Sequence, residues 1–229
     1  MYDTMYFEAL ASQELKDSFP LISGILRLAV KYLITSYRKR CIGILSCYFP
    51  SGATWTFPKD FPGIRPSQCG AMISLARELN LLALLPSAFL ILASYLTISS
   101  KTESIYAMPS LTTQDKADLC HGTLGLLTAQ ADDMFPFPHF FTPAETCQAS
   151  GNCSVEAGSK NYRRQPYRVF IFVHEDFLNV KAVVCEACWV NVKNIFREGR
   201  QKTWERLPEI FHLGKDWNEL RRIQDNDYS

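Results

Sequence analysis

Two pairs of cysteines are the residues of this chain whose type and spacing best suit a defined chemistry. Cys185 and Cys188 are separated by two residues, and Cys147 and Cys153 are separated by five. Four thiolates brought together form a tetrahedral structural zinc site. Cys185 and Cys188 are expected at a helix N-terminus, and Cys147 and Cys153 in a loop. The five-residue gap exceeds the usual spacing of about two to four. The alternative is that Cys185 and Cys188 are apolar helix contacts.

Other chemistry has less support in the sequence. A redox Cys-x-x-Cys of the thioredoxin type needs a strand leading directly into it, whereas the strand-like run Val169–Val173 ends well before Cys185. His121 is an outside candidate ligand, but a surface helix position fits it better. The chain has no nucleophile elbow, zinc-protease helix or phosphate-binding loop motif. His174-Glu175-Asp176 has no identifiable nucleophile beside it, so we expect no enzymatic activity.

Composition limits the classes of partner. The 229 residues carry a formal net charge of +1, which favours neither nucleic acid nor an anionic membrane. The most basic segment, Lys160 to Arg168, is expected to be a solvated loop. The chain contains eight cysteines, and it opens without the basic and apolar regions of a secretory signal. A reducing compartment, cytoplasmic or nuclear, is therefore expected.

The stretch from Ser18 to Pro50 predicts two antiparallel helices joined by a very short connection. A polar break at Thr35-Ser36 separates two runs with helical apolar spacing. The buried faces are expected to hold Ile25, Leu26, Leu28, Ala29, Tyr32 and Leu33 in the first helix, and Tyr37, Cys41, Ile44, Leu45 and Tyr48 in the second. Cys41 and Cys47 are expected to act as small apolar residues there. Arg27, Lys31, Arg38, Lys39 and Arg40 are expected to be solvated.

The central part of the chain predicts further helices. Leu81–Ile98 contains no charged residue and approaches the length that spans a bilayer. Pro86 interrupts it and its flanks show no Lys/Arg asymmetry, so a buried core helix beginning near Pro86 is expected. Ser67 is a candidate cap of the preceding helix. Thr112 and Asp115 have the spacing of a capping box that opens the next helix.

The last strong helix is expected from Cys185 to Leu207, with Pro208 ending it. One face of that helix would carry Trp189, Val192, Phe196, Thr203 and Leu207. A boundary is expected between Phe135 and Pro143. The chain is thus predicted to be mainly α: a helical hairpin and multi-helix bundle, then a smaller cysteine-containing helical subdomain. The expected parts are residues 1–50, 51–135 and 143–225.

Several motifs together resemble the mushroom-type fungal BTB/POZ domain proteins. The first are Tyr2-Asp3-x2-Tyr6-Phe7-Glu8, Leu26-Arg27-Leu28-x2-Lys31-Tyr32, Arg38-Lys39 and Phe49-Pro50. Ala76-Arg77-Glu78, Leu84-Leu85-Pro86 and the segment 110–122 follow. The most specific are Cys185-x2-Cys188, Arg197-Glu198-Gly199-Arg200-x3-Trp204-x2-Leu207-Pro208-x-Ile210-Phe211-x-Leu213 and Trp217-x-Glu219-Leu220. The resemblance covers nearly the whole chain and matches the end of the BTB-like domain with its helical extension.

The resemblance implies a non-enzymatic protein–protein interaction module, with a role as substrate adaptor for a ubiquitin ligase. The strand-rich BTB core, which makes the family's dimer and docks a cullin in relatives, would lie before Tyr2 and is absent. Cullin and homodimer contacts therefore cannot be assigned to residues of this chain, and its protein partners are unknown. The alternative function is a structural-zinc or thiol-redox regulatory protein that uses Cys185 and Cys188. A single structural zinc is the one candidate cofactor.

Overall fold

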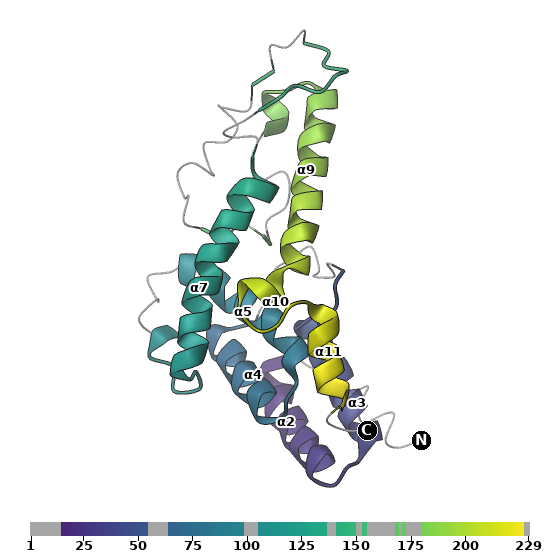
Figure 1. Cartoon of the computed structure of the whole chain (residues 1–229), viewed down its shortest axis with the longest axis vertical. Coiled ribbons are helices and arrows are strands. Elements are labelled where there is room, and N and C mark those ends of the chain that lie inside the picture. The colour runs from purple at the N-terminus through teal and green to yellow at the C-terminus, as the bar shows by residue number, and fades with distance from the viewer. Residues whose placement is uncertain are drawn as a thin grey trace.

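The protein is mainly helical in the part that the computed structural model describes. That part comprises residues 15–54, 64–98, 105–136, 141–149, 153–154, 168–169, 171–172 and 180–226. No strand occurs within these ranges, which confirms the prediction of a mainly α fold. The helices form an elongated body, with the α2–α3 turn at one end of the long axis and the N-terminus of α9 at the other (Figure 1). Of the segments discussed above, residues 2–8, 160–167 and 174–176 lie outside the described ranges.

The first two helices form the predicted hairpin. Helix α2 spans Leu15–Lys31 and α3 spans Thr35–Tyr48, so the connection consists of residues 32–34 and lies just before the expected break at Thr35-Ser36. The buried stripe of α2 contains Ile22, Leu26 and Ala29. The predicted burial of Leu28, Tyr32 and Leu33 is wrong, since their side chains are 55%, 62% and 75% exposed. Helix α2 is apolar on two sides, and the tight turn brings only one of them against α3.

Two further expectations, both in α3, are wrong. Arg38 is buried rather than solvated, because α11 (Trp217–Asn226) covers it. Its guanidinium Nη2 donates a hydrogen bond of 3.0 Å to the carbonyl oxygen of Gln224. Cys47 is exposed, so it does not serve as a core residue, whereas Cys41 is fully buried.

The centre of the molecule is built by α4 (Pro66–Glu78) and α5 (Leu85–Ile98), which pack against each other. A 3₁₀ turn, η1 (Leu82–Leu84), precedes α5. Side chains along α5 from Leu85 to Ala93 are almost completely buried, as predicted for a core helix. Among the described residues, no helix combines the length and apolar character needed to cross a bilayer.

Helix α7 (Thr113–Ala129) begins with the predicted capping box. Asp115 N–H donates to the hydroxyl of Thr112 at 3.1 Å, and Thr112 N–H donates to the Asp115 carboxylate at 3.1 Å. A π turn, η2 (Gln130–Met134), continues α7. Among the described residues of the strand-like run, position 169 has no regular structure and positions 171 and 172 lie in a turn, with Val169 and Ile171 buried.

The C-terminal elements return to the main body. A 3₁₀ turn, η4 (Val180–Ala182), leads to α9 (Glu186–Glu205), and α10 (Leu207–Ile210) and α11 follow. All five residues predicted for the inner face of the last strong helix are buried. The indole of Trp204 stacks on that of Trp217 with ring centroids 5.0 Å apart, and its Nε1–H donates to the Gly52 carbonyl at 2.7 Å. One hydrophobic cluster therefore runs from Leu15 to Trp217.

Candidate metal centre

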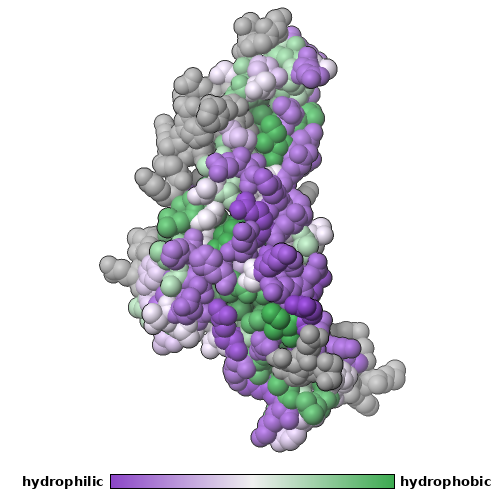
Figure 2. All heavy atoms as spheres, viewed as in Figure 1, coloured by the Kyte–Doolittle hydropathy of each residue, from purple (hydrophilic) through white to green (hydrophobic). Residues whose placement is uncertain are grey.

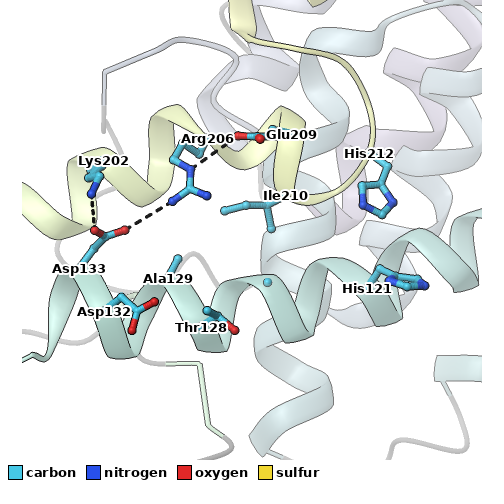
Figure 3. Close-up of a pocket in the computed structure, with 11 residues that line it drawn as sticks. His121, Thr128, Ala129, Asp132, Asp133, Lys202, Arg206, Glu209, Ile210 and His212 are labelled. Atoms are coloured by element: carbon cyan, nitrogen blue, oxygen red, sulfur yellow. Dashed lines mark hydrogen bonds and ion pairs between the residues drawn. The ribbon is translucent and has the colours of Figure 1, made fainter. Parts of the chain in front are cut away.

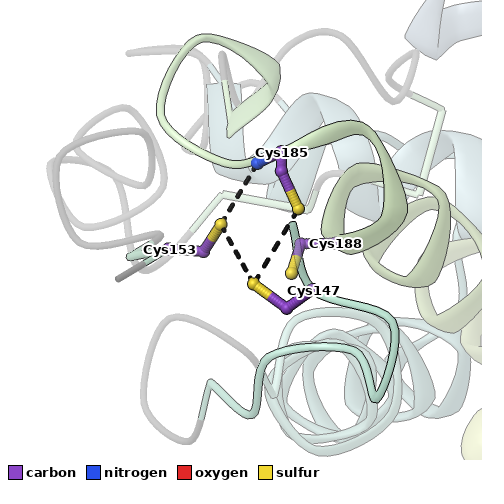
Figure 4. Close-up of side chains that lie close together, drawn as sticks. All are labelled: Cys147, Cys153, Cys185 and Cys188. Carbon is purple, nitrogen blue, oxygen red and sulfur yellow. Dashed lines mark hydrogen bonds between the residues drawn. The ribbon is translucent and has the colours of Figure 1, made fainter. Parts of the chain in front are cut away.

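The four predicted cysteines come together at the N-terminal end of α9. Cys185 is the N-cap residue of α9, with extended backbone angles, and Cys188 lies in its first turn. Their spacing of three positions places both thiols on the same side of that turn. Cys147 ends a turn in which its N–H donates to the Ala144 carbonyl at 2.9 Å, and Cys153 approaches from beyond that turn. The four sulfur atoms face a common centre (Figure 4).

The distances between the sulfur atoms suit a single metal ion. All four Sγ atoms lie within 4.8 Å of one another. The Sγ of Cys147 is 3.7 Å from that of Cys153 and 3.9 Å from that of Cys185. A tetrahedral zinc with Zn–S bonds of ~2.3 Å requires S···S separations of about 3.8 Å. The four thiols are free, and their separations are far from the ~2.05 Å of a disulfide bond.

Backbone N–H groups donate to three of the four sulfur atoms. The N–H of Cys185 donates to Cys153 Sγ at 3.2 Å, that of Gln148 to Cys185 Sγ at 3.4 Å, and that of Ala144 to Cys188 Sγ at 3.4 Å. Each bond joins the loop that carries Cys147 and Cys153 to the start of α9. Such donors stabilise negative charge on sulfur, as a thiolate ligand set requires.

The thiols differ in their pKa values. Hydrogen bonds from the backbone N–H groups of Cys188 and Gln148 lower the pKa of Cys185 to about 6, which favours its thiolate. Removal from water raises the pKa of Cys188 to about 12. The N–H of Cys185 acts to lower the pKa of Cys153, but burial and hydrogen bonds with neighbouring thiols outweigh it and raise that pKa. A bound metal cation would lower the pKa of the buried thiols, because its positive charge stabilises their thiolate forms.

The arrangement suits a structural rather than a catalytic metal. Cys153 and Cys188 are buried, and Cys147 and Cys185 are partly covered. Four protein ligands fill a tetrahedral coordination sphere, so no position is left for water or substrate. The thioredoxin-like alternative lacks its structural context, because the described residues just before Cys185 form the turn η4 rather than a strand.

The remaining cysteines lie away from this centre. Cys41 and Cys69 are buried in the helical core, where removal from water raises the pKa of both thiols, that of Cys41 to about 11. Cys47 and Cys120 are exposed. None of these four belongs to the cluster of thiols around Cys185.

His121 does not join the cysteine cluster; it lies at one end of a polar groove between α7 and α10 (Figure 3). The ring of His212 is 5.5 Å away from its ring, centroid to centroid. The cavity has a volume of about 770 Å³. At its other end the Asp133 carboxylate pairs with Lys202 and Arg206. Sequence reasoning missed this groove, because its lining comes from two chain segments, residues 121–133 and 202–212, that share no motif.

The chain matches no protein-family model, no curated protein and no solved structure. The likeness to the fungal BTB/POZ proteins stays a prediction.

Proposed function

We propose that this chain is a non-enzymatic protein-interaction module whose C-terminal part is held in shape by one structural zinc ion. The observation that carries the proposal is the convergence of Cys147, Cys153, Cys185 and Cys188, with all sulfur atoms within 4.8 Å. The ion would link the loop that carries Cys147 and Cys153 to the N-terminus of α9. A site of this kind contributes directly to folding free energy, because it does not exist in the unfolded chain.

Zinc is the metal that best fits the ligand set. Thiolates are soft ligands, and four of them in tetrahedral arrangement suit zinc. The N–H···S bonds of Ala144, Gln148 and Cys185 supply the outer contacts that hold thiolate ligands in place. Thiolates persist under reducing conditions, which supports the proposed cytoplasmic or nuclear location.

The interaction role rests on the closed ligand sphere and on the resemblance to fungal BTB/POZ proteins. A metal with four protein ligands stabilises a shape and supplies no reactive position. Proteins of this family type act by binding other proteins, and a substrate adaptor of a ubiquitin ligase is the specific form we propose. Helices that expose large apolar side chains provide a surface for such binding, and this chain exposes several on α2.

Metal analysis of the purified chain tests the zinc assignment. We expect about one equivalent of zinc, measured by elemental mass spectrometry. Co²⁺ should bind tightly in place of zinc and give the visible absorption of a tetrahedral thiolate complex. Cys188→Ser should lose both signals. Cys120→Ser is the matched control, because Cys120 is exposed and lies outside the cluster, and it should retain both.

Two results would contradict the assignment. The first is a chain that takes up neither zinc nor Co²⁺ after reduction of its thiols. The second is a Cys188→Ser variant that binds metal as tightly as the unaltered chain. In either case the four cysteines would be apolar or hydrogen-bonded packing residues.

A further inference from the structure

A second apolar stripe runs along α2 beside its buried face and ends at Tyr32, one residue past the helix. The stripe consists of Leu21, Ile25, Leu28 and Tyr32. Leu21, Leu28 and Tyr32 are 44%, 55% and 62% exposed, and Ile25 is partly buried. Apolar side chains are visible on the surface at the end of the molecule where α2 and α3 lie (Figure 2). Exposed apolar groups gathered on one face mark an interaction site more often than isolated ones do.

The spacing of the stripe is that of a helix-packing seam. Its members follow one another at intervals of four, three and four residues, which is the a/d rhythm of a coiled coil. Its ends, Leu21 and Tyr32, are 11 positions apart in the sequence, so the seam is roughly 17 Å long, enough for about three turns of a partner helix. Leu33, at 75% exposed, and Ile34, at 40%, extend the apolar surface beyond its C-terminal end.

The helical hairpin that carries the stripe is basic. Between Asp17 and Pro50 the sequence contains five cations and no acidic residue. Arg27 is paired with Glu78, at 2.6 Å between Nη2 and Oε2, and Arg38 is buried against α11. Lys31, Lys39 and Arg40 remain exposed. The ammonium group of Lys31 lies over the ring of Tyr32, 5.4 Å from its centroid, so positive charge borders the stripe directly.

We propose that the stripe of Leu21, Ile25, Leu28 and Tyr32 docks an acidic amphipathic helix of a partner protein. The seam spacing selects a helix as the occupant, and the basic border selects acidic residues beside its apolar face. A second copy of this chain would bring two basic hairpins together, which costs binding energy. An anionic bilayer would meet the same charges, but a straight seam along one helix matches another helix better than a fluid surface. The inference rests on the proposed interaction function and names the partner's chemistry.

A defined peptide tests this docking. The probe is a fluorescently labelled synthetic helix of about three heptads with leucine at its a and d positions and glutamate beside them. The comparison peptide has lysine in place of every glutamate. Binding is measured by fluorescence anisotropy against the zinc-loaded chain. The glutamate peptide should bind about tenfold or more tightly than the lysine peptide, and added salt should weaken its binding.

Variants locate the binding surface. The double variant Leu28→Ser/Tyr32→Ser should weaken binding of the glutamate peptide about tenfold or more, because these are the two most exposed side chains of the seam. Both positions are exposed, so the variant should fold, which its circular dichroism melt would verify. Leu124→Ser on α7 is the matched control, since Leu124 is 61% exposed but distant in sequence from the stripe, and it should bind like the unaltered chain.

Several results would overturn the proposal. These are no binding of the glutamate peptide, equal binding of both peptides, or binding that survives the double variant. A lipid surface would be identified instead if the chain sedimented with phosphatidylcholine vesicles only when they contained phosphatidylserine. The double variant would then have to lose this sedimentation. Self-association lost in the double variant would identify a second copy. If the peptide does not bind but the chain still binds zinc, the docking proposal is wrong and the zinc proposal is unaffected. The two proposals can therefore fail separately.

Discussion

Replacing Gly199 by alanine should destabilise the protein, although alanine is the better helix former. Gly199 lies inside α9, where the exchange would contribute about 0.8–1.0 kcal/mol of helix propensity. Its added Cβ, however, would lie 2.1 Å from the carbonyl oxygen of Asp133 and 2.8 Å from the Cα of Met134. Ordinary contact begins at 3.4 Å, so α9 and η2 would have to separate by about 1 Å.

The clash outweighs the propensity gain. Overpacking a close contact costs about 1–3 kcal/mol, and the upper end applies here because the obstructing atoms belong to the backbone and cannot rotate away. We therefore expect a net loss of about 2 kcal/mol in the free energy of unfolding. In a protein of this size that corresponds to a melting temperature lower by about 4–8 °C, measured by calorimetry on the zinc-loaded chain.

Gly43→Ala in α3 is the matched control. A Cβ there would meet no atom within 4 Å, so the same exchange should raise stability by up to about 1 kcal/mol. Opposite signs for the two variants would support the close approach of α9 to η2. A Gly199→Ala variant that is as stable as Gly43→Ala would refute it.

Other perturbations test separate features of the structure. Leu26→Ala should cost about 2–5 kcal/mol in urea unfolding because Leu26 is fully buried, whereas Leu28→Ala should change stability by less than about 0.5 kcal/mol; equal losses would contradict the observed orientation of α2. Trp204→Ala should cost about 3–5 kcal/mol through lost packing and a lost hydrogen bond, and a negligible change in its thermal melt would contradict a core role. The Arg27 hydrogen bonds lower the pKa of Glu78, so the pair stabilises the protein above the ordinary value of 4.5 and stops doing so as pH falls through the lowered value. Because both side chains are about half exposed, Glu78→Gln should cost under about 1 kcal/mol in urea unfolding at pH 7, and a loss that persists in high salt would contradict a screened surface pair. Removing the metal should speed hydrogen exchange in the first turn of α9 and leave its last turn protected, and uniform loss of protection would contradict a local role.

Helix positions followed well from the sequence, because caps and apolar spacing act locally. The Thr112–Asp115 capping box and the buried run of α5 were predicted for the physical reasons that the structure displays. The buried face of α2 could not be derived in the same way. Its sequence has apolar residues on two sides of the helix. The turn after Lys31 sets which of these sides packs against neighbouring helices, and Leu26 rather than Leu28 is buried as a result.

All four cysteines were predicted as one candidate site, but only part of that prediction rested on a local sequence signal. The spacing of Cys185 and Cys188 at a helix start is a local signal, and it identified the pair correctly as neighbours on one turn. That Cys147 and Cys153 meet them depends on the path of the chain between the two pairs, which the sequence does not specify by any local rule. The burial of Arg38 has the same origin, since α11 reaches it from 186 positions further along.

Helix α9 is held at three points along its length, and they differ in kind. Its N-terminal end is joined to the loop that carries Cys147 and Cys153. Further along, Gly199 approaches η2. At the C-terminal end, Trp204 donates to the Gly52 carbonyl and stacks on Trp217. The last two contacts involve only packing and hydrogen bonds, so they hold α9 on the body without a metal. A zinc ion would therefore order the far end of a helix that is already anchored. The apolar stripe of α2 lies toward the opposite end of the long axis (Figure 1), so the two proposals concern surfaces that do not share residues.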